Sequence, residues 1–138
     1  MTRPEYYFNN SAKLASYLKH FYQNPTPLKI DSSLYFMWAY YAAYFANNIA
    51  YPEYLFPAKF IANSYGVKVP KQDGKIVIPN YNQNVQNLIS NLALQIDSAP
   101  DYQLVIRIRQ DKSYQKALLT QSKQINLPDL VKEYAGLI

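Results

Sequence analysis

The chain has no cysteine, so disulfide bonds, thiol catalysis and thiolate metal sites are excluded. It has one histidine, His20, which we expect at the surface near a helix end rather than in a catalytic or zinc site. Its 3 glycines are too few for the glycine-rich loops that hold phosphate groups. Its 9 acidic residues are scattered, which disfavours glycosidase-like chemistry. These absences predict a non-enzymatic protein with no catalytic residues, metal or cofactor.

Membrane-length apolar runs and negative charge are scarce as well. The most apolar run, at residues 34–46, is shorter than the roughly 17–25 residues that cross a bilayer. Residues 1–10 are polar and lack the apolar centre of a secretory signal. We therefore expect a cytoplasmic protein. The 14 Lys and Arg residues exceed the 9 Asp and Glu residues by 5, and this mild positive charge favours acidic partners.

What the chain does contain is an apolar, aromatic middle. With 138 residues, 49% of them hydrophobic, residues 1–138 are expected to fold as one domain with its own core. Aromatic residues make up 16% of the chain, and 15 of them are tyrosines. Many of them lie in residues 34–45, which we expect to be buried. The predicted structural core includes Leu34, Tyr35, Phe36, Trp38, Phe60 and Gly66.

The spacing of apolar residues predicts a mainly α-helical protein, a compact bundle of helices around one central buried helix. The central helix is predicted at residues 27–48, where Thr26 caps it and Pro27 occupies its first position. A short helical or irregular stretch is expected at residues 113–119. The other predicted helices are at residues 11–23, 58–64, 82–96, 99–108 and 128–134.

Two segments carry mixed signals. Residues 104–109 alternate like a strand, but Ser98, Pro100 and Asp101 form a good helix start, so we favour a helix at residues 99–108. A small β-hairpin is expected at residues 67–78, where a turn at Asp73-Gly74 separates two β-branched segments.

A basic patch and one tyrosine are the candidate partner-binding features. Positive residues dominate between residues 107 and 123. Either they bind an acidic protein surface or a nucleic acid, or they form an ordinary solvated face of the protein. Tyr65 precedes Gly66, and either it contacts a partner or it packs locally while the glycine supplies a left-handed cap. The candidate residues are Tyr65, Arg107, Arg109, Lys112 and Lys116, with Lys123 at the end of the patch.

The order of several short motifs resembles the Panacea family, the SocA-like antitoxin domain of phage-associated and toxin–antitoxin proteins. The resemblance extends over nearly the whole chain. At several positions the chain departs from the family pattern, for example at Ser32, Ser33 and Asn63. The residues that carry the resemblance are Leu28-Lys29-Ile30, Leu34-Tyr35-Phe36, Leu55-Phe56, Phe60, Ala62, Tyr65, Gly66, Pro70, Leu104-Val105, Tyr114-Gln115-Lys116-Ala117, Ile125, Leu130 and Tyr134.

The resemblance implies a helical, non-enzymatic neutraliser that inhibits a toxic partner protein by direct binding. An alternative is a phage-encoded inhibitor of host defence, such as an anti-CRISPR protein, that binds a nuclease or nucleoprotein. A second alternative is a nucleic-acid-binding protein. The sequence contains no recognised nucleic-acid-binding motif, so we expect contact with nucleic acid to be weak or to occur through a nucleoprotein.

Overall fold

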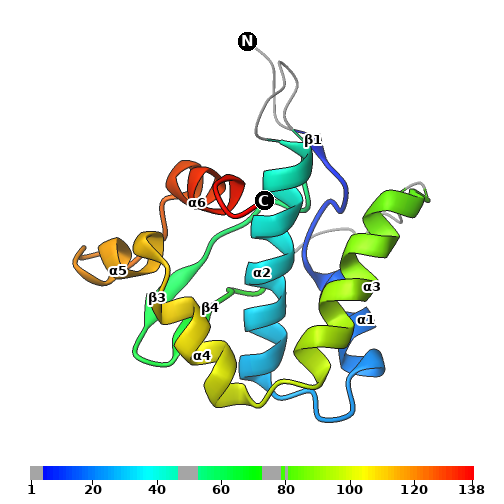
Figure 1. Cartoon of the computed structure of the whole chain (residues 1–138), viewed down its shortest axis with the longest axis horizontal. Helices are drawn as coiled ribbons and strands as arrows, with labels where there is room; N and C mark the ends of the chain where they lie inside the picture. The colour runs from blue at the N-terminus through cyan, green and yellow to red at the C-terminus, as the bar shows by residue number, and fades with distance from the viewer. Residues whose placement is uncertain (1–4, 47–52, 73–78, 80) are drawn as a thin grey trace.

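The computed structural model of the chain describes residues 5–46, 53–72, 79 and 81–138 (Figure 1). These residues form six helices and two small two-stranded sheets. The predicted mainly α-helical class is therefore confirmed. The helices are α1 (Ala12–Phe21), α2 (Pro27–Phe45), α3 (Gln83–Asp97), α4 (Asp101–Arg109), α5 (Lys112–Leu118) and α6 (Leu127–Ala135). The strands are β1 (Glu5–Tyr6), β2 (Glu53–Tyr54), β3 (Ile61–Asn63) and β4 (Gly66–Lys68).

Helix α2 is the centre of the fold. Its start is as predicted, because the Thr26 side chain accepts a hydrogen bond from the Lys29 amide at 3.1 Å and Pro27 follows at the first helical position. Its apolar residues lie on nearly every face, so the helix contacts α1, α3, α4, α6, β2 and β4 (Figure 1). The described part of the helix ends at Phe45, and the last two residues predicted for it lie outside the described residues.

Polar residues inside α2 are buried with partners. Ser33 lies against α1, where its hydroxyl donates to the Lys29 carbonyl and meets the Tyr22 hydroxyl, each at 2.7 Å. Lys29 is also buried, and its ammonium donates to the Asp97 carbonyl at the end of α3 at 3.1 Å. A cation at this position complements the negative end of the α3 dipole. These polar groups therefore tie α2 to both helices.

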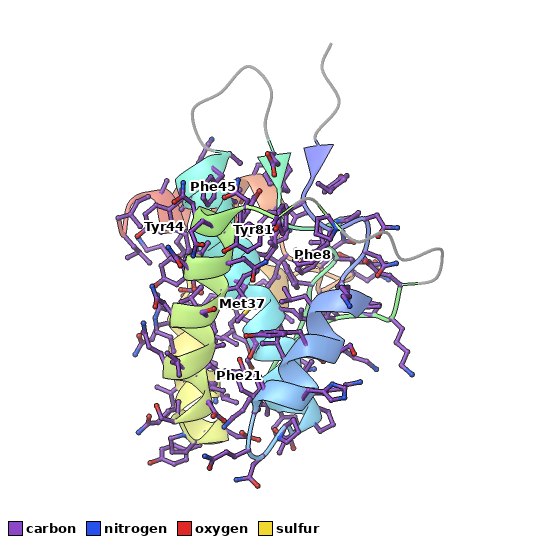
Figure 2. All side chains as sticks on the ribbon, turned by 90° about the vertical axis from the view of Figure 1, so that its right-hand side faces the viewer. Phe8, Phe21, Met37, Tyr44, Phe45 and Tyr81 are labelled. Carbon is purple, nitrogen blue, oxygen red and sulfur yellow. The ribbon has the colours of Figure 1, made fainter. Side chains whose placement is uncertain are left out.

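Helices α1 and α3 cover one side of α2. Figure 2 views this side, with α1 and α3 in front of α2 and the buried residues Phe8 and Met37 labelled. The buried residues of α3, which are Val85, Ile89, Ala93 and Ile96, belong to the core, and Asn82 caps the helix by accepting from the amides of Asn84 and Val85. The sequence pattern predicted both helices because a single apolar stripe is a local signal.

The ambiguous segment at residues 102–109 is a helix, α4, as we favoured. The predicted cap is wrong, however. Ser98 ends α3 instead, where its hydroxyl donates to the Gln95 carbonyl at 3.0 Å, and Pro100 occupies the N-cap position of α4. The Asp101 carboxylate accepts a hydrogen bond from the Thr26 hydroxyl at 2.7 Å. This bond joins the starts of α2 and α4.

The predicted helix at residues 58–64 is wrong, because strand β3 occupies this segment and pairs antiparallel with β4. On its other side, β3 pairs with residues 123–125 through bonds from the Ala62 amide to the Lys123 carbonyl and from the Ile125 amide to the Phe60 carbonyl. These long-range hydrogen bonds favour a strand over a local helix. Strands β3 and β4 form a hairpin, whereas the turn and second strand of the hairpin expected at residues 67–78 lie outside the described residues.

The second sheet is a parallel pair, β1 with β2, which the sequence did not reveal. It continues through bonds from the amides of Tyr7 and Phe8 to the carbonyls of Tyr54 and Leu55 at 2.9 and 2.8 Å. The single tryptophan lies beneath it. The Trp38 indole N–H donates to the Phe56 carbonyl at 3.0 Å, and its ring stacks on Tyr54.

A buried carboxylate joins three helices. Asp111, which is 2% exposed, lies between α4 and α5. One of its oxygens accepts from the hydroxyls of Tyr35 on α2 and Tyr134 on α6, at 2.6 and 2.7 Å. The other accepts from Arg107 on α4 at 2.7 Å. Burial is the main cause that raises the pKa of both tyrosines, and neighbouring charges that include Asp111 raise it further. Their hydroxyls therefore stay protonated and donate.

We predict that Asp111→Asn lowers the free energy of unfolding by about 2–3 kcal/mol, because it leaves the Arg107 charge without its partner. Tyr35→Phe removes one donor and costs about 1–2 kcal/mol. The double variant costs less than the sum of the two because both changes break one network. Urea unfolding followed by Trp38 fluorescence measures these differences, with the exposed Tyr65→Phe as the control. An Asp111→Asn protein as stable as the wild type contradicts the prediction.

Candidate interaction surfaces

The structure separates the residues of the predicted basic patch. Arg107 is half-buried, pairs with Asp111 and lies over the Tyr134 ring, 5.7 Å from its centroid. Burial lowers the pKa of Arg107, but the hydrogen bond to Asp111 and the surrounding charges outweigh burial and raise the pKa above its ordinary value. Arg109, two residues later, is exposed. The two arginines therefore do not form one patch.

The lysines of the patch lie along α5 and beyond it. Lys116 forms an ion pair with Asp129 on α6 at 3.3 Å, and both side chains are well exposed. Lys112 is exposed, and its backbone amide donates to Glu133 on α6 at 2.6 Å. The Lys123 ammonium donates to the Leu118 carbonyl at 2.9 Å. His20 is exposed in the last turn of α1, as expected, with its ring bonded to the Ser16 carbonyl at 2.8 Å.

An exposed apolar stripe runs along the outer side of α4. Tyr102, Ile106 and Arg109 follow one another at four- and three-residue spacing, which places them on one face of the helix. Tyr102 is 63% exposed and Ile106 is 53% exposed. We name these three residues, together with Tyr65, the α4 face. Tyr102 and Ile106 were not among the predicted binding residues, although their spacing within the predicted helix is the signal that identifies them.

Tyr65 is 76% exposed at the turn between β3 and β4. Gly66, which follows it, has a φ of +114°, and the site of its absent Cβ faces Ile108 of α4 at 3.7 Å. The turn therefore lies beside the C-terminal half of α4. Since Lys123 is the one non-glycine residue with positive φ in the described ranges, the left-handed position of the turn falls on Gly66.

Several contacts fix the backbone beneath Tyr65. The Asn63 side chain accepts from the Tyr65 amide at 2.8 Å, and the Asn63 carbonyl accepts from the Tyr114 hydroxyl of α5. The hairpin is also held by its pairing with residues 123–125. The expected core residues Phe60 and Gly66 are buried at its base, and Leu34, Tyr35, Phe36 and Trp38 are buried on α2. An exposed aromatic ring on a fixed backbone loses little further freedom when it is covered.

A groove lies on the other flank of α4, between α2, α3 and α4. Its volume is about 530 Å³. Helix α2 contributes Tyr40 and Tyr44, α3 contributes Leu88 and Leu92, and α4 contributes Arg107. Figure 2 shows Tyr44 near the C-terminal end of α2, on the opposite side of the view from α1. We name this feature the α2–α3–α4 groove. The sequence did not predict it, because it depends on the angle between three helices.

Neither a relative, nor a metal site, nor a membrane span indicates the class of this protein among the described residues. No protein-family model, curated protein or solved structure matches the chain. Among the described residues, no cluster of three or more His, Asp or Glu side chains is placed to hold a metal ion. None of the helices in the described ranges combines the length and apolar character of a membrane span. The chain is thus defined here as a mainly α-helical domain with an exposed aromatic face and an adjacent groove.

The start of helix α5 is capped by one carboxylate from α6. Glu133 accepts from the amides of Lys112 and Ser113 and from the Ser113 hydroxyl, so a residue of α6 caps α5. Burial raises the pKa of Glu133, but the hydrogen bonds from Ser113 and Lys112 outweigh it and lower the net pKa. A carboxyl group with a lowered pKa in the folded state stabilises the fold above its unfolded pKa and loses this effect as it is protonated.

We therefore predict that Glu133→Gln lowers the free energy of unfolding by about 1 kcal/mol at neutral pH, the usual effect of a lost cap. The difference from the wild type shrinks as the pH falls below about 4.3, the ordinary value for Glu, and disappears once the folded carboxyl is protonated. Urea unfolding of both proteins across this range measures it. Asp31, whose pKa is raised by burial, is common to both proteins and cancels. A difference that does not change with pH contradicts the assignment.

Proposed function

We propose that the protein neutralises a toxic partner protein by binding to it, in the manner of an antitoxin. The observation that carries this proposal is the α4 face, where Tyr102 and Ile106 are exposed on the helix with Arg109, and Tyr65 is exposed on the turn near its C-terminal half. Tyr and Arg are enriched among the residues that dominate binding energy at protein interfaces. Exposed apolar side chains that gather on one face are also typical of interaction sites.

The area that a stable complex requires indicates how far the partner extends. A specific interface buries about 1,200–2,000 Å² in total, shared between the two proteins. Helix α4 has nine residues and is about 13 Å long, so its outer face alone is too small. The partner must also cover neighbouring elements. The hairpin turn extends the surface on one flank of α4 (Figure 1), and the α2–α3–α4 groove extends it on the other flank.

A second candidate function uses the same face. Arg109 and Lys112 are exposed and two residues separate them, and the chain carries a net charge of +5. Positive charge beside exposed aromatic rings suits an acidic protein surface, including that of a defence nuclease bound to its guide, as in inhibition of CRISPR. Direct binding of bare nucleic acid is a third alternative. It is distinguished by a steep loss of affinity with salt.

We predict that Ile106→Glu and Tyr65→Ala each weaken binding by about tenfold or more, because each removes an exposed apolar anchor from the α4 face. Mass spectrometry identifies the partner captured from the source cells by the wild-type chain, and calorimetry with the purified partner gives the affinities. Coexpression then shows whether the chain suppresses the toxicity of that partner.

Arg109→Glu belongs in the same series, whereas Arg107→Glu does not, because a second carboxylate beside Asp111 destabilises the fold. Tyr17→Ala on α1 is the matched control for Tyr65→Ala, since Tyr17 is an exposed tyrosine outside the α4 face. Variants of the α4 face that bind the partner as tightly as the Tyr17→Ala control contradict the proposal. A captured partner that is an enzyme of no toxicity to the cell contradicts the antitoxin-like role.

A further inference from the structure

The α2–α3–α4 groove has the form of an open helix-packing position. Its walls are rows of side chains at four-residue spacing, with Phe36, Tyr40 and Tyr44 on α2 and Leu88 and Leu92 on α3. Such rows are the ridges that pack against another helix. The α2 row is about 12 Å long, which matches roughly two turns of a helix, and the α3 row is about half as long.

The chemistry of the walls favours a helix over an extended chain. The groove is bounded by three helices, whose backbone groups bond within each helix and offer no sheet edge. A strand or loop placed there would leave those of its amide and carbonyl groups that face the buried Phe36, Ile96 and Leu104 without partners. A helix satisfies these groups internally and presents only side chains. Asn91 and Gln95 supply a polar rim on α3.

Arg107 supplies the charge at the α4 wall, and it carries the one positive or negative charge among the lining residues. Its guanidinium is fixed by the 2.7 Å bond to Asp111 and by the Tyr134 ring, while its side chain keeps 36% of its exposure. The Asp111 bond uses Nη1, one of several nitrogens that present the five N–H donors of a guanidinium. A fixed guanidinium of this kind recognises a carboxylate with defined geometry.

We infer that this groove binds an amphipathic helix of the partner protein, whose apolar residues at i, i+3, i+4 and i+7 fill the groove and whose acidic side chain accepts from Arg107. The inference rests on the proposed function, since it names the element of the partner that the chain engages. It adds a second contact region to the α4 face. Helix α4 then lies within the interface, with Arg107 directed to one region and Arg109 to the other.

A peptide selection tests the inference without knowledge of the partner. The full chain is immobilised, and a phage-displayed library of helix-forming peptides of about three turns is panned against it. We expect enriched peptides to share the i, i+3, i+4, i+7 apolar spacing and one acidic position. A fluorescein-labelled consensus peptide, and the same peptide with its acid changed to the amide, are then titrated by fluorescence anisotropy.

Matched variants locate the bound peptide. Tyr44→Ala and Leu92→Lys are expected to weaken binding of the acidic peptide by about tenfold, whereas Tyr17→Ala and Leu94→Lys, which lie outside the groove, leave it unchanged. Tyr44 is 57% exposed, so its truncation leaves the fold intact even if Leu92→Lys does not. The wild type is expected to bind the acidic peptide more tightly than the amide peptide. The difference in affinity is expected to shrink in Arg107→Lys, which keeps the positive charge but loses the planar guanidinium with its paired N–H donors.

Two results overturn the inference. One is a selection that enriches no helical pattern, and the other is a consensus peptide that binds Tyr44→Ala as tightly as Tyr17→Ala. Both are distinguishable from failure of the proposed function. A partner captured through the α4 face that is indifferent to Tyr44→Ala leaves the proposed function standing without the groove. A groove that binds the peptide in a chain that captures no toxic partner leaves the groove as a helix-binding site and removes the proposed function.

Discussion

The carboxylate of Asp111 has almost no contact with water, and its three donors come from three helices. Tyr35 belongs to the central helix, Tyr134 to α6 and Arg107 to α4. Removing a charge from water costs several kcal/mol, so such a group persists only where its donors are all in place. The net gain in stability from a buried cluster of this kind is small. Its effect is on geometry, because α4 is held at one rotation relative to α2 and α6.

That rotation determines what the surface offers. Arg107 points to the groove side of α4 because it must reach Asp111, and helix geometry then places Tyr102, Ile106 and Arg109 on the outer side. The hairpin is fixed to the same helix through Gly66, which lies against Ile108, and to α5 through Tyr114, so Tyr65 lies near the C-terminal half of α4. A surface built on contacts of this kind is formed before a partner arrives, which reduces the entropy lost on binding.

Much of the fold was predictable from local sequence signals, and the site was less so. Thr26-Pro27 and the continuous apolar run identify α2, and a single apolar stripe identifies α3, because each signal lies within its own element. The segment at residues 61–63 misled the prediction, since its pairing with residues 123–125 is invisible locally. The separation of the basic residues in space is also invisible in the sequence. Arg107 and Arg109 look alike in the sequence, and the buried partner of Arg107 is what separates them.

We propose that the chain acts by presenting α4 and its two flanks to another protein. Hydrogen exchange of the chain, alone and bound to its captured partner, tests this claim most directly because it maps the covered surface without any substitution. We expect slower exchange at the turn formed by residues 64–66 and along α4, with exchange in α1 unchanged. Slower exchange confined to α1, with unaltered rates at the turn and α4, would contradict it.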